Sequence, residues 1–273
     1  MDPETRDRVL AALGVVERKF NINQPRDPHS GKWVDTKPGD GKARRIAGGL
    51  RKSLTDATSL PEVEQALADE AKKITGRDFH VDMKGSDTQI AREHAEGVLQ
   101  GLERYPEVRL SRVETYGPGG AREDFSGDPA GRAFAVTERG RYSANDDAIL
   151  FNVREAGDPR RYRTKLKLNL AAGWMATGTP TGVALHEFGH VLSGPDFGIY
   201  RAEQAAKAEA KAARRRTSKY VQETVSMYAA AAGGELAAEA FADVMVNGGK
   251  ASDLSRVIVA EIDNEYAKNG TRR

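Results

Sequence analysis

The chain has 273 residues, enough for one large domain or two modest ones with a sizeable core. Lys and Arg total 42 against 40 Asp and Glu, and this near balance argues against a dedicated nucleic-acid-binding protein, because such proteins usually carry a strong basic excess. The absence of cysteine excludes disulfides, thiolate zinc sites and a cysteine nucleophile, so any metal site must be built from His and carboxylates.

The N-terminal region predicts a short helix followed by a linker. Apolar residues recur near helical spacing over residues 3–20. Residues 21–49 are rich in Pro, Gly, Asp and Lys, and such a segment buries too little apolar surface to offset its ordering entropy. We therefore expect an N-terminal helix and flexible linker over 1–55 and a globular domain over 56–273.

Neither a signal-peptide core at the N-terminus nor an apolar run of membrane-spanning length stands out. We therefore expect a cytoplasmic protein with no membrane association, or one released without the general secretory route.

The first half of the globular part predicts helices followed by a group of short strands. Pro61 begins a helix whose apolar positions recur at helical spacing. Clusters of Gly, Pro and Asp then divide three short segments that are typical of strands. The predicted elements of this half are helices at 61–74 and 86–104 and strands at 108–117, 132–140 and 147–155.

The remainder of the chain predicts three helices, at 179–194, 201–219 and 234–248, and the last of them is followed by the segment 253–266. Thr181 is the expected N-cap of the first, and Gly194-Pro195 ends it. The second is rich in Ala, Lys and Arg and carries a basic cluster at 214–216. This cluster could contact a phosphate or an acidic partner, but such a run is more often a solvated helix face.

The helix at 179–194 contains an HExxH motif, formed by His186, Glu187 and His190. Residues four apart lie on one face of a helix, so both imidazoles can reach one ion. Zn²⁺ accepts histidine nitrogens readily and in catalytic sites takes three protein ligands and a water. Glu187 could then accept the proton of that water as general base. The alternative is a pair of histidines hydrogen-bonded to neighbours, with a solvent-facing glutamate.

A third ligand is expected from the acidic residues of the helix at 234–248. Glu235, Glu239 and Asp243 are spaced by four, so they share one face and repel one another, and a nearby dication would relieve that repulsion. The alternative is an acidic solvent face, although no Lys or Arg neighbours these acids. Spacing alone leaves open which acid binds. If the first coordinates the metal and the second accepts the ring N–H of a ligating histidine, Glu235 is the ligand and Glu239 supports it.

These motifs resemble the gluzincin-type sites of the anthrax lethal factor group and of phage-encoded zincins found with head-morphogenesis proteins. In that group a tyrosine precedes the ligand glutamate by the same interval that separates Tyr228 from Glu235. The glutamate there opens an E-x-x-A-E-x-F pattern, which residues 235–241 match. The likeness extends more loosely over residues 60–265, and the basic, Ala-rich insert at 201–219 has no counterpart that defines substrate.

The resemblance implies a role for each residue of the site. His186, His190 and Glu235 would bind Zn²⁺, and Glu187 would be the base. Tyr228 would face the metal from the opposite side and donate a hydrogen bond to the developing oxyanion or to the leaving amine. Without the resemblance, Tyr228 would be interpreted as an ordinary core tyrosine.

The resemblance also implies a fold and a function. The fold would be a zincin-like α+β arrangement, with a small mixed sheet, an active-site helix carrying HExxH and a helical C-terminal subdomain. Zincins usually pair an extended substrate with an edge strand upstream of the motif, and residues 147–153 are the candidate. The function would be that of a zinc-dependent endopeptidase encoded by a phage or mobile element. It would act on a polypeptide in the bacterial cytoplasm or in the virion, with phage structural proteins as candidate partners.

Two other functions are weighed beside this one. The first is a phage structural or assembly protein that kept the fold and uses zinc for stability. The intact motif argues against it, because a purely structural site needs neither Glu187 nor Tyr228. The second is a nucleic-acid contact through the basic helix, against which the near-neutral charge argues. His29, His80 and His94 have no partner at ligand spacing, so they are interpreted as structural or exposed.

Overall fold

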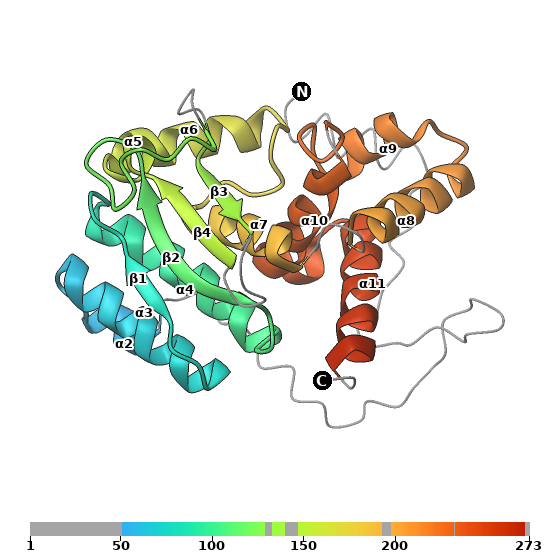
Figure 1. Cartoon of the computed structure of the whole chain (residues 1–273). Helices are drawn as coiled ribbons and strands as arrows, with labels where there is room; N and C mark the ends of the chain where they lie inside the picture. Colours follow the sequence, from blue (N-terminus) through green and yellow to red (C-terminus); the bar gives the residue numbers. More distant parts are fainter. Residues whose placement is uncertain (1–50, 129–132, 140–146, 193–197, 232, 271–273) are drawn as a thin grey trace. The chain divides into compact units, whose positions relative to one another are not determined.

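The computed structural model describes residues 51–128, 133–139, 147–192, 198–231 and 233–270 (Figure 1). The helix expected at 3–20 and most of the expected linker lie outside these residues. The described residues belong to one compact unit, Gly48–Arg273. Its first helix, α2 (Lys52–Asp56), places Leu54 fully in the core, so the folded unit begins before the boundary expected between residues 55 and 56.

A mixed sheet of four strands forms the framework. Its strands lie in the order β1-β2-β4-β3, and β1, β2 and β4 run parallel while β3 runs antiparallel to β4. The strands are β1 (His80–Asp82), β2 (Leu110–Tyr116), β3 (Ala135–Glu138) and β4 (Asp147–Asn152). The three expected strands are confirmed, but the one expected over 147–155 ends at Asn152, whose side chain caps the short helix that follows at Val153–Ala156. The short β1 was missed because three residues in a polar stretch are too few to show an alternating pattern.

The expectation that residues 147–153 form the edge strand is wrong. β2 pairs directly with β4, so β4 lies inside the sheet with five of its six residues buried. β3 precedes β4 in the chain but pairs on its other side, so among the described strands β3 lies at one edge of the sheet and β1 at the other. The order of strands in a sheet depends on pairings that are distant in sequence, which local patterns do not reveal.

The two helices expected before the sheet are confirmed as α3 (Leu60–Thr75) and α4 (Thr88–Arg104). Ser59 and Glu62 form a capping box at α3, and the Asp87 carboxylate caps α4. Two further helices, α5 (Val153–Ala156) and α6 (Pro159–Ala171), lie at the upper end of the sheet in Figure 1. α6 was missed because it buries only Tyr162 and Leu166, which is a weak apolar stripe.

The C-terminal part is helical and lies on the other side of α7 from the sheet, at the right of Figure 1. It consists of α8 (Gly198–Ala212), α9 (Thr217–Thr224), α10 (Gly233–Asn247), a short 3-10 turn η1 (Gly248–Lys250) and α11 (Asp253–Gly270). α10 is its centre, since it packs against α7, α8 and α11. None of the described helices combines the length and the apolar character needed to cross a bilayer.

The single helix expected over 201–219 is wrong, because the chain turns between α8 and α9. Arg214 takes a left-handed conformation with φ 54°, and its N–H donates to the carbonyl of Lys211. The N–H of Arg215 donates to the carbonyl of Ala210, which completes a Schellman motif. Such motifs usually carry glycine at the left-handed position, and its absence here hid the turn. The Arg215 side chain pairs with Glu223 of α9.

α7 (Pro180–Leu192) runs between α4 and α10, and both neighbours approach it closely. An added Cβ on Gly97 of α4 would lie 2.6 Å from the carbonyl oxygen of Thr181. An added Cβ on Gly189 of α7 would lie 2.7 Å from Cα of Ala238 in α10. Because both glycines allow the backbones to meet, α7 is enclosed on both sides and its position is fixed.

Candidate metal centre

The start of α7 is capped by Thr179. Its hydroxyl oxygen accepts from the N–H of Gly182 at 3.0 Å, and Pro180 takes the first helical position, where proline is favoured. The expectation that Thr181 is the N-cap is therefore wrong, since its hydroxyl donates instead to the carbonyl of Glu93 at 3.0 Å. α7 ends at Leu192, and the expected stop at Gly194-Pro195 lies outside the described residues.

The two histidines of the motif point to the same place. Their Nε2 atoms are 3.1 Å apart, as expected for residues one helical turn apart on α7. Glu235 reaches them from the first turn of α10, with Oε2 at 3.1 Å from Nε2 of His186 and 3.4 Å from Nε2 of His190. The three residues could hold a metal ion, and His186 is buried while the other two are partly exposed.

The donor set fits a tetrahedral divalent cation. Zinc–ligand bonds of about 2.0–2.1 Å at tetrahedral angles separate the ligand atoms by about 3.3–3.5 Å, close to the separations here. The other ring nitrogen of His186, Nδ1, lies 2.8 Å from Oε1 of Glu239. If Nδ1 carries the proton of a neutral ring, Nε2 presents a lone pair. Lone pairs from two rings and a carboxylate then converge on one point, and a bound cation would accept all three.

Glu239 is the polar centre of the surrounding structure. It is only 1% exposed, and both of its oxygens are used. Oε1 faces the His186 ring, while Oε2 accepts from the hydroxyl of Ser226 at 2.8 Å and from the N–H of Ala176 at 2.6 Å. Glu239 thus orients a candidate ligand, and it joins α10 to the segments before α7 and before α10.

The electrostatics of the site follow from these contacts. Burial lowers the pKa of His186, but its hydrogen bonds with Glu235 and Glu239 outweigh burial and raise that pKa to about 10. Burial raises the pKa of Glu235, but the hydrogen bonds from both histidines hold it well below its usual range. A proton on His186 therefore occupies the place of a cation, so metal and proton compete for the site.

Glu187 and Tyr228 line the same pocket as the ligand set. The pocket has a volume of about 240 Å³. Its lining residues are Ala135, Val136, Thr137, Arg139, His186, Glu187, His190, Tyr228 and Glu235. Glu187 is 5% exposed, and its Oε2 accepts from the hydroxyl of Thr137 at 2.8 Å. The two residues expected to be catalytic are thus brought together with the three expected ligands.

Tyr228 is held between two other rings. It stacks on His186 with centroids 5.7 Å apart, and on Trp174 with centroids 5.8 Å apart. Backbone hydrogen bonds join Tyr228 to Trp174 and Met227 to Gly173. Burial and the charge of Glu235 raise the pKa of Tyr228 well above its usual value, so its hydroxyl keeps its proton and can donate.

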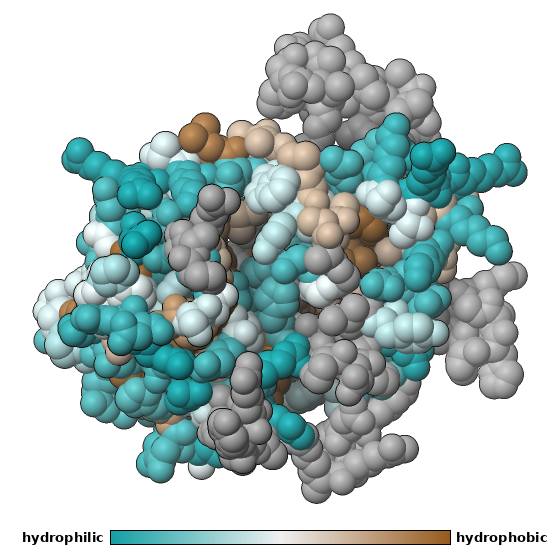
Figure 2. Space-filling view, turned by 45° about the horizontal axis from the view of Figure 1, so that its top comes forward, coloured by the Kyte–Doolittle hydropathy of each residue, from teal (hydrophilic) through white to brown (hydrophobic). Residues whose placement is uncertain are grey.

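The ring of Trp174, which stacks on Tyr228, is partly exposed. Trp174 is 44% exposed, and Leu168 and Leu170 of α6 are also among the exposed large apolar residues. Figure 2 shows apolar atoms gathered along the upper edge of an otherwise mostly polar face.

Asp243, the third acid of the α10 face, takes no part in this group. Its carboxylate accepts from the side-chain amide of Asn247 and from the N–H of Ser252, so it fixes the end of α10. His94 is fully buried, hydrogen-bonds Tyr162 at 3.0 Å and stacks on Phe151.

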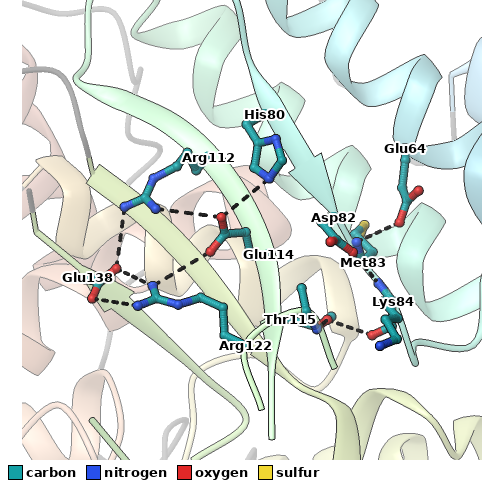
Figure 3. A network of polar contacts seen from close by, with 11 residues as sticks. Glu64, His80, Asp82, Met83, Lys84, Arg112, Glu114, Thr115, Arg122 and Glu138 are labelled. Atoms are coloured by element: carbon teal, nitrogen blue, oxygen red, sulfur yellow. Dashed lines mark hydrogen bonds and ion pairs between the residues drawn. The ribbon is translucent and has the colours of Figure 1, made fainter. Parts of the chain in front are cut away.

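His80 is exposed at one end of a charged network on the sheet, 3.5 Å from Glu114 (Figure 3). Both His80 and His94 therefore have the structural or exposed settings that were expected of them. His29 lies outside the described residues.

Several site residues carry no motif in the sequence. Thr137 lies in β3 and Arg139 directly follows that strand, but the pattern alone does not show which face of the strand meets α7. Ser226 and Trp174 lie in irregular segments that only the folded chain brings to Glu239 and Tyr228.

The pocket offers a complete set of groups for hydrolysis at a metal. Two imidazoles and a carboxylate can ligate, a second carboxylate can accept a proton, and a phenol can donate a hydrogen bond. A third carboxylate, that of Glu239, orients one of the ligating rings. Comparison with models of protein families, with curated proteins and with solved structures gave no match to this chain.

Proposed function

We propose that this chain is a zinc-dependent endopeptidase with a zincin-like fold. The observation that supports it best is the convergence of the ligand atoms of His186, His190 and Glu235 in a pocket that Glu187 and Tyr228 also line. Structural zinc sites are closed by four protein ligands, whereas catalytic sites have three and keep one position open. The candidate group has three ligands among the described residues, and it borders the pocket.

The roles of the residues follow from their placement. When bound, zinc lowers the pKa of a coordinated water and polarises a substrate carbonyl. Glu187 accepts the proton of the attacking water and passes it to the leaving amine. The Tyr228 hydroxyl donates to the oxygen that gains negative charge. Glu239 keeps the His186 ring in one orientation, so the ligand is in place before metal or substrate arrives.

The edge strand supplies the proposed place for a polypeptide. β3 is an edge strand of the sheet as described, and its Ala135, Val136 and Thr137 line the pocket. An extended peptide can add to such an edge through its backbone, which brings a peptide bond beside the metal group. We further propose, from the resemblance, a phage or mobile-element origin, with a structural protein of the particle as the substrate.

Metal analysis and a cleavage screen test this proposal together. We expect one zinc per chain and cleavage of peptides in a proteome-derived library. Glu187→Gln should keep the zinc and lose at least about 100-fold in rate, because only the base is removed. His186→Ala should lose the zinc. His80→Ala removes an exposed histidine outside the pocket, so it should retain both metal and activity.

The same experiments separate the enzyme from the assembly protein. If chelation lowers the melting temperature but the zinc-loaded protein cuts no peptide of the library, the metal is structural and the peptidase proposal fails. Cleavage by Glu187→Gln at the rate of the unmodified protein would instead refute the role of Glu187 alone.

A further inference from the structure

Edge strand β3 is tied to its surroundings by three successive side chains. Thr137 of β3 and Arg139, which directly follows the strand, contact α7, whereas Glu138 between them contacts Arg112 and Arg122. Arg139 donates through Nη2 to the carbonyl of His190 at 2.8 Å. Thr137 contacts Glu187. The inner side of β3 is therefore fixed to the last two turns of α7, which carry the motif.

The outer side of β3 is fixed by the charged network of Figure 3. The carboxylate of Glu138 pairs with the guanidinium groups of Arg112 and Arg122. Both arginines also lie 3.7 Å from a carboxylate oxygen of Glu114 on β2. This network links the edge strand to β2 across the intervening β4. With both sides held, the position of Thr137 is set jointly by the charged network on the sheet and by the contact of Arg139 with α7.

The hydroxyl of Thr137 meets Glu187 at two points. Its Oγ1 lies 2.8 Å from Oε2 of the Glu187 side chain and 2.9 Å from the Glu187 carbonyl oxygen. A hydroxyl has one proton to donate, and a hydrogen bond to an ionised carboxylate is the stronger of the two choices. The side chain of glutamate has three rotatable bonds. A contact from a separate, fixed element is what limits the positions its carboxylate can take.

We propose that Thr137 is a positioning residue for the hydrolytic reaction, because its hydroxyl holds the Glu187 carboxylate at the pocket. This inference rests on the proposed function, since Glu187 acts as base only if the pocket hydrolyses a bond. The proposed role of Thr137 connects the position of the bound peptide with the position of the base, Glu187. The strand proposed to pair with the peptide is also the strand that aligns the base, so both are in register before the reaction begins.

Kinetics of three variants test the role of the hydroxyl. Thr137→Val keeps the shape of the side chain but removes the donor, and Thr137→Ser keeps the donor. The matched control is Thr181→Val, which removes a part-buried hydroxyl of α7 that donates to a backbone carbonyl outside the pocket. Each is measured with zinc loaded, on a fluorogenic peptide that carries the best-cleaved sequence of the proteome-derived library.

We expect Thr137→Val to lower kcat about 10-fold to 100-fold, with KM within about twofold, because substrate binding is intact and only the base is misaligned. Thr137→Ser should restore most of kcat, and Thr181→Val should match the unmodified protein. Zinc content should be one per chain in all of them. In crystal structures of the metal-free proteins, the Glu187 carboxylate should leave its place only in Thr137→Val.

Two results would overturn the inference in distinguishable ways. If Thr137→Val keeps the kcat of the unmodified protein while Glu187→Gln is inactive, Thr137 has no positioning role and the proposed function stands. If the unmodified, zinc-loaded protein cleaves no peptide, the proposed function and this inference fall together.

Discussion

The distance between α7 and α10 sets how far Glu235 lies from the two histidines. Gly189 of α7 lies where the two helices pack closely against each other. In Gly189→Ala, the new Cβ would be 2.7 Å from Cα of Ala238 and 3.3 Å from both its Cβ and its carbonyl oxygen. Ordinary contacts begin near 3.4 Å, so α10 would have to retreat by about 0.7 Å.

That retreat acts directly on the candidate ligands, because Ala238 lies between Glu235 and Glu239 on α10. Metal–ligand distances tolerate changes of about 0.2 Å, well below the displacement expected here. We therefore expect the zinc affinity of Gly189→Ala to fall at least about 10-fold, as when groups that support ligands are removed. Overpacking should also cost about 1–3 kcal/mol of unfolding free energy.

Gly97→Ala is the matched control, because it crowds α7 from the side of α4. Its Cβ would lie 2.6 Å from the carbonyl oxygen of Thr181 and 2.8 Å from Cβ of Ala184. It should lose a similar unfolding free energy but keep its zinc affinity within about threefold, since α10 is not displaced. The assays are urea unfolding with a chelator present and zinc titration against a chromophoric competitor. If Gly189→Ala loses stability but binds zinc as tightly as Gly97→Ala, helix spacing does not control the site.

Two further predictions concern buried groups. Glu239→Gln should weaken zinc binding about 10-fold to 100-fold in the same titration. An amide has one acceptor oxygen, so it cannot accept from both the His186 ring and the Ala176 N–H. Unchanged affinity would show that the contact between Glu239 and His186 does not support the ligand. Burial lowers the pKa of His94 to about 3, below its unfolded value of about 6.5, so the stability it contributes is present above pH 6.5 and is lost as the pH falls toward 3. The unfolding free energy should therefore fall less between pH 7 and pH 5 in His94→Phe, which keeps a ring against Phe151, than in the unmodified protein, by about 2 kcal/mol. Urea unfolding with a chelator present measures both losses. An equal loss in the two proteins would exclude His94 as the titrating group.

The candidate ligands could be predicted from the sequence because their arrangement is mostly local. The histidines of HExxH lie one turn apart on any helix, and the same period puts Glu235 and Glu239 on one face of α10. The partners of those residues could not be predicted in the same way. Thr137 comes from a strand whose place at the sheet edge depends on the pairing of β2 with β4, which no local pattern encodes.

The errors in element boundaries have local causes. Thr179 caps α7 because Pro180 follows it and suits the first helical position, a signal that the sequence contains. The Asp158-Pro159 pair at the start of α6 is the same kind of signal. The turn after α8 gave no such signal, since Arg214 occupies the left-handed position that glycine usually takes.

The contacts of Glu239 have a consequence for how the pocket comes apart. Through Ala176 and Ser226, this one carboxylate braces the two chain segments that carry Trp174 and Tyr228. Removing this carboxylate therefore loosens the stacked rings of Trp174 and Tyr228 together with the ligand cluster. In Glu239→Gln, limited proteolysis should cut first at 173–177 and 225–231.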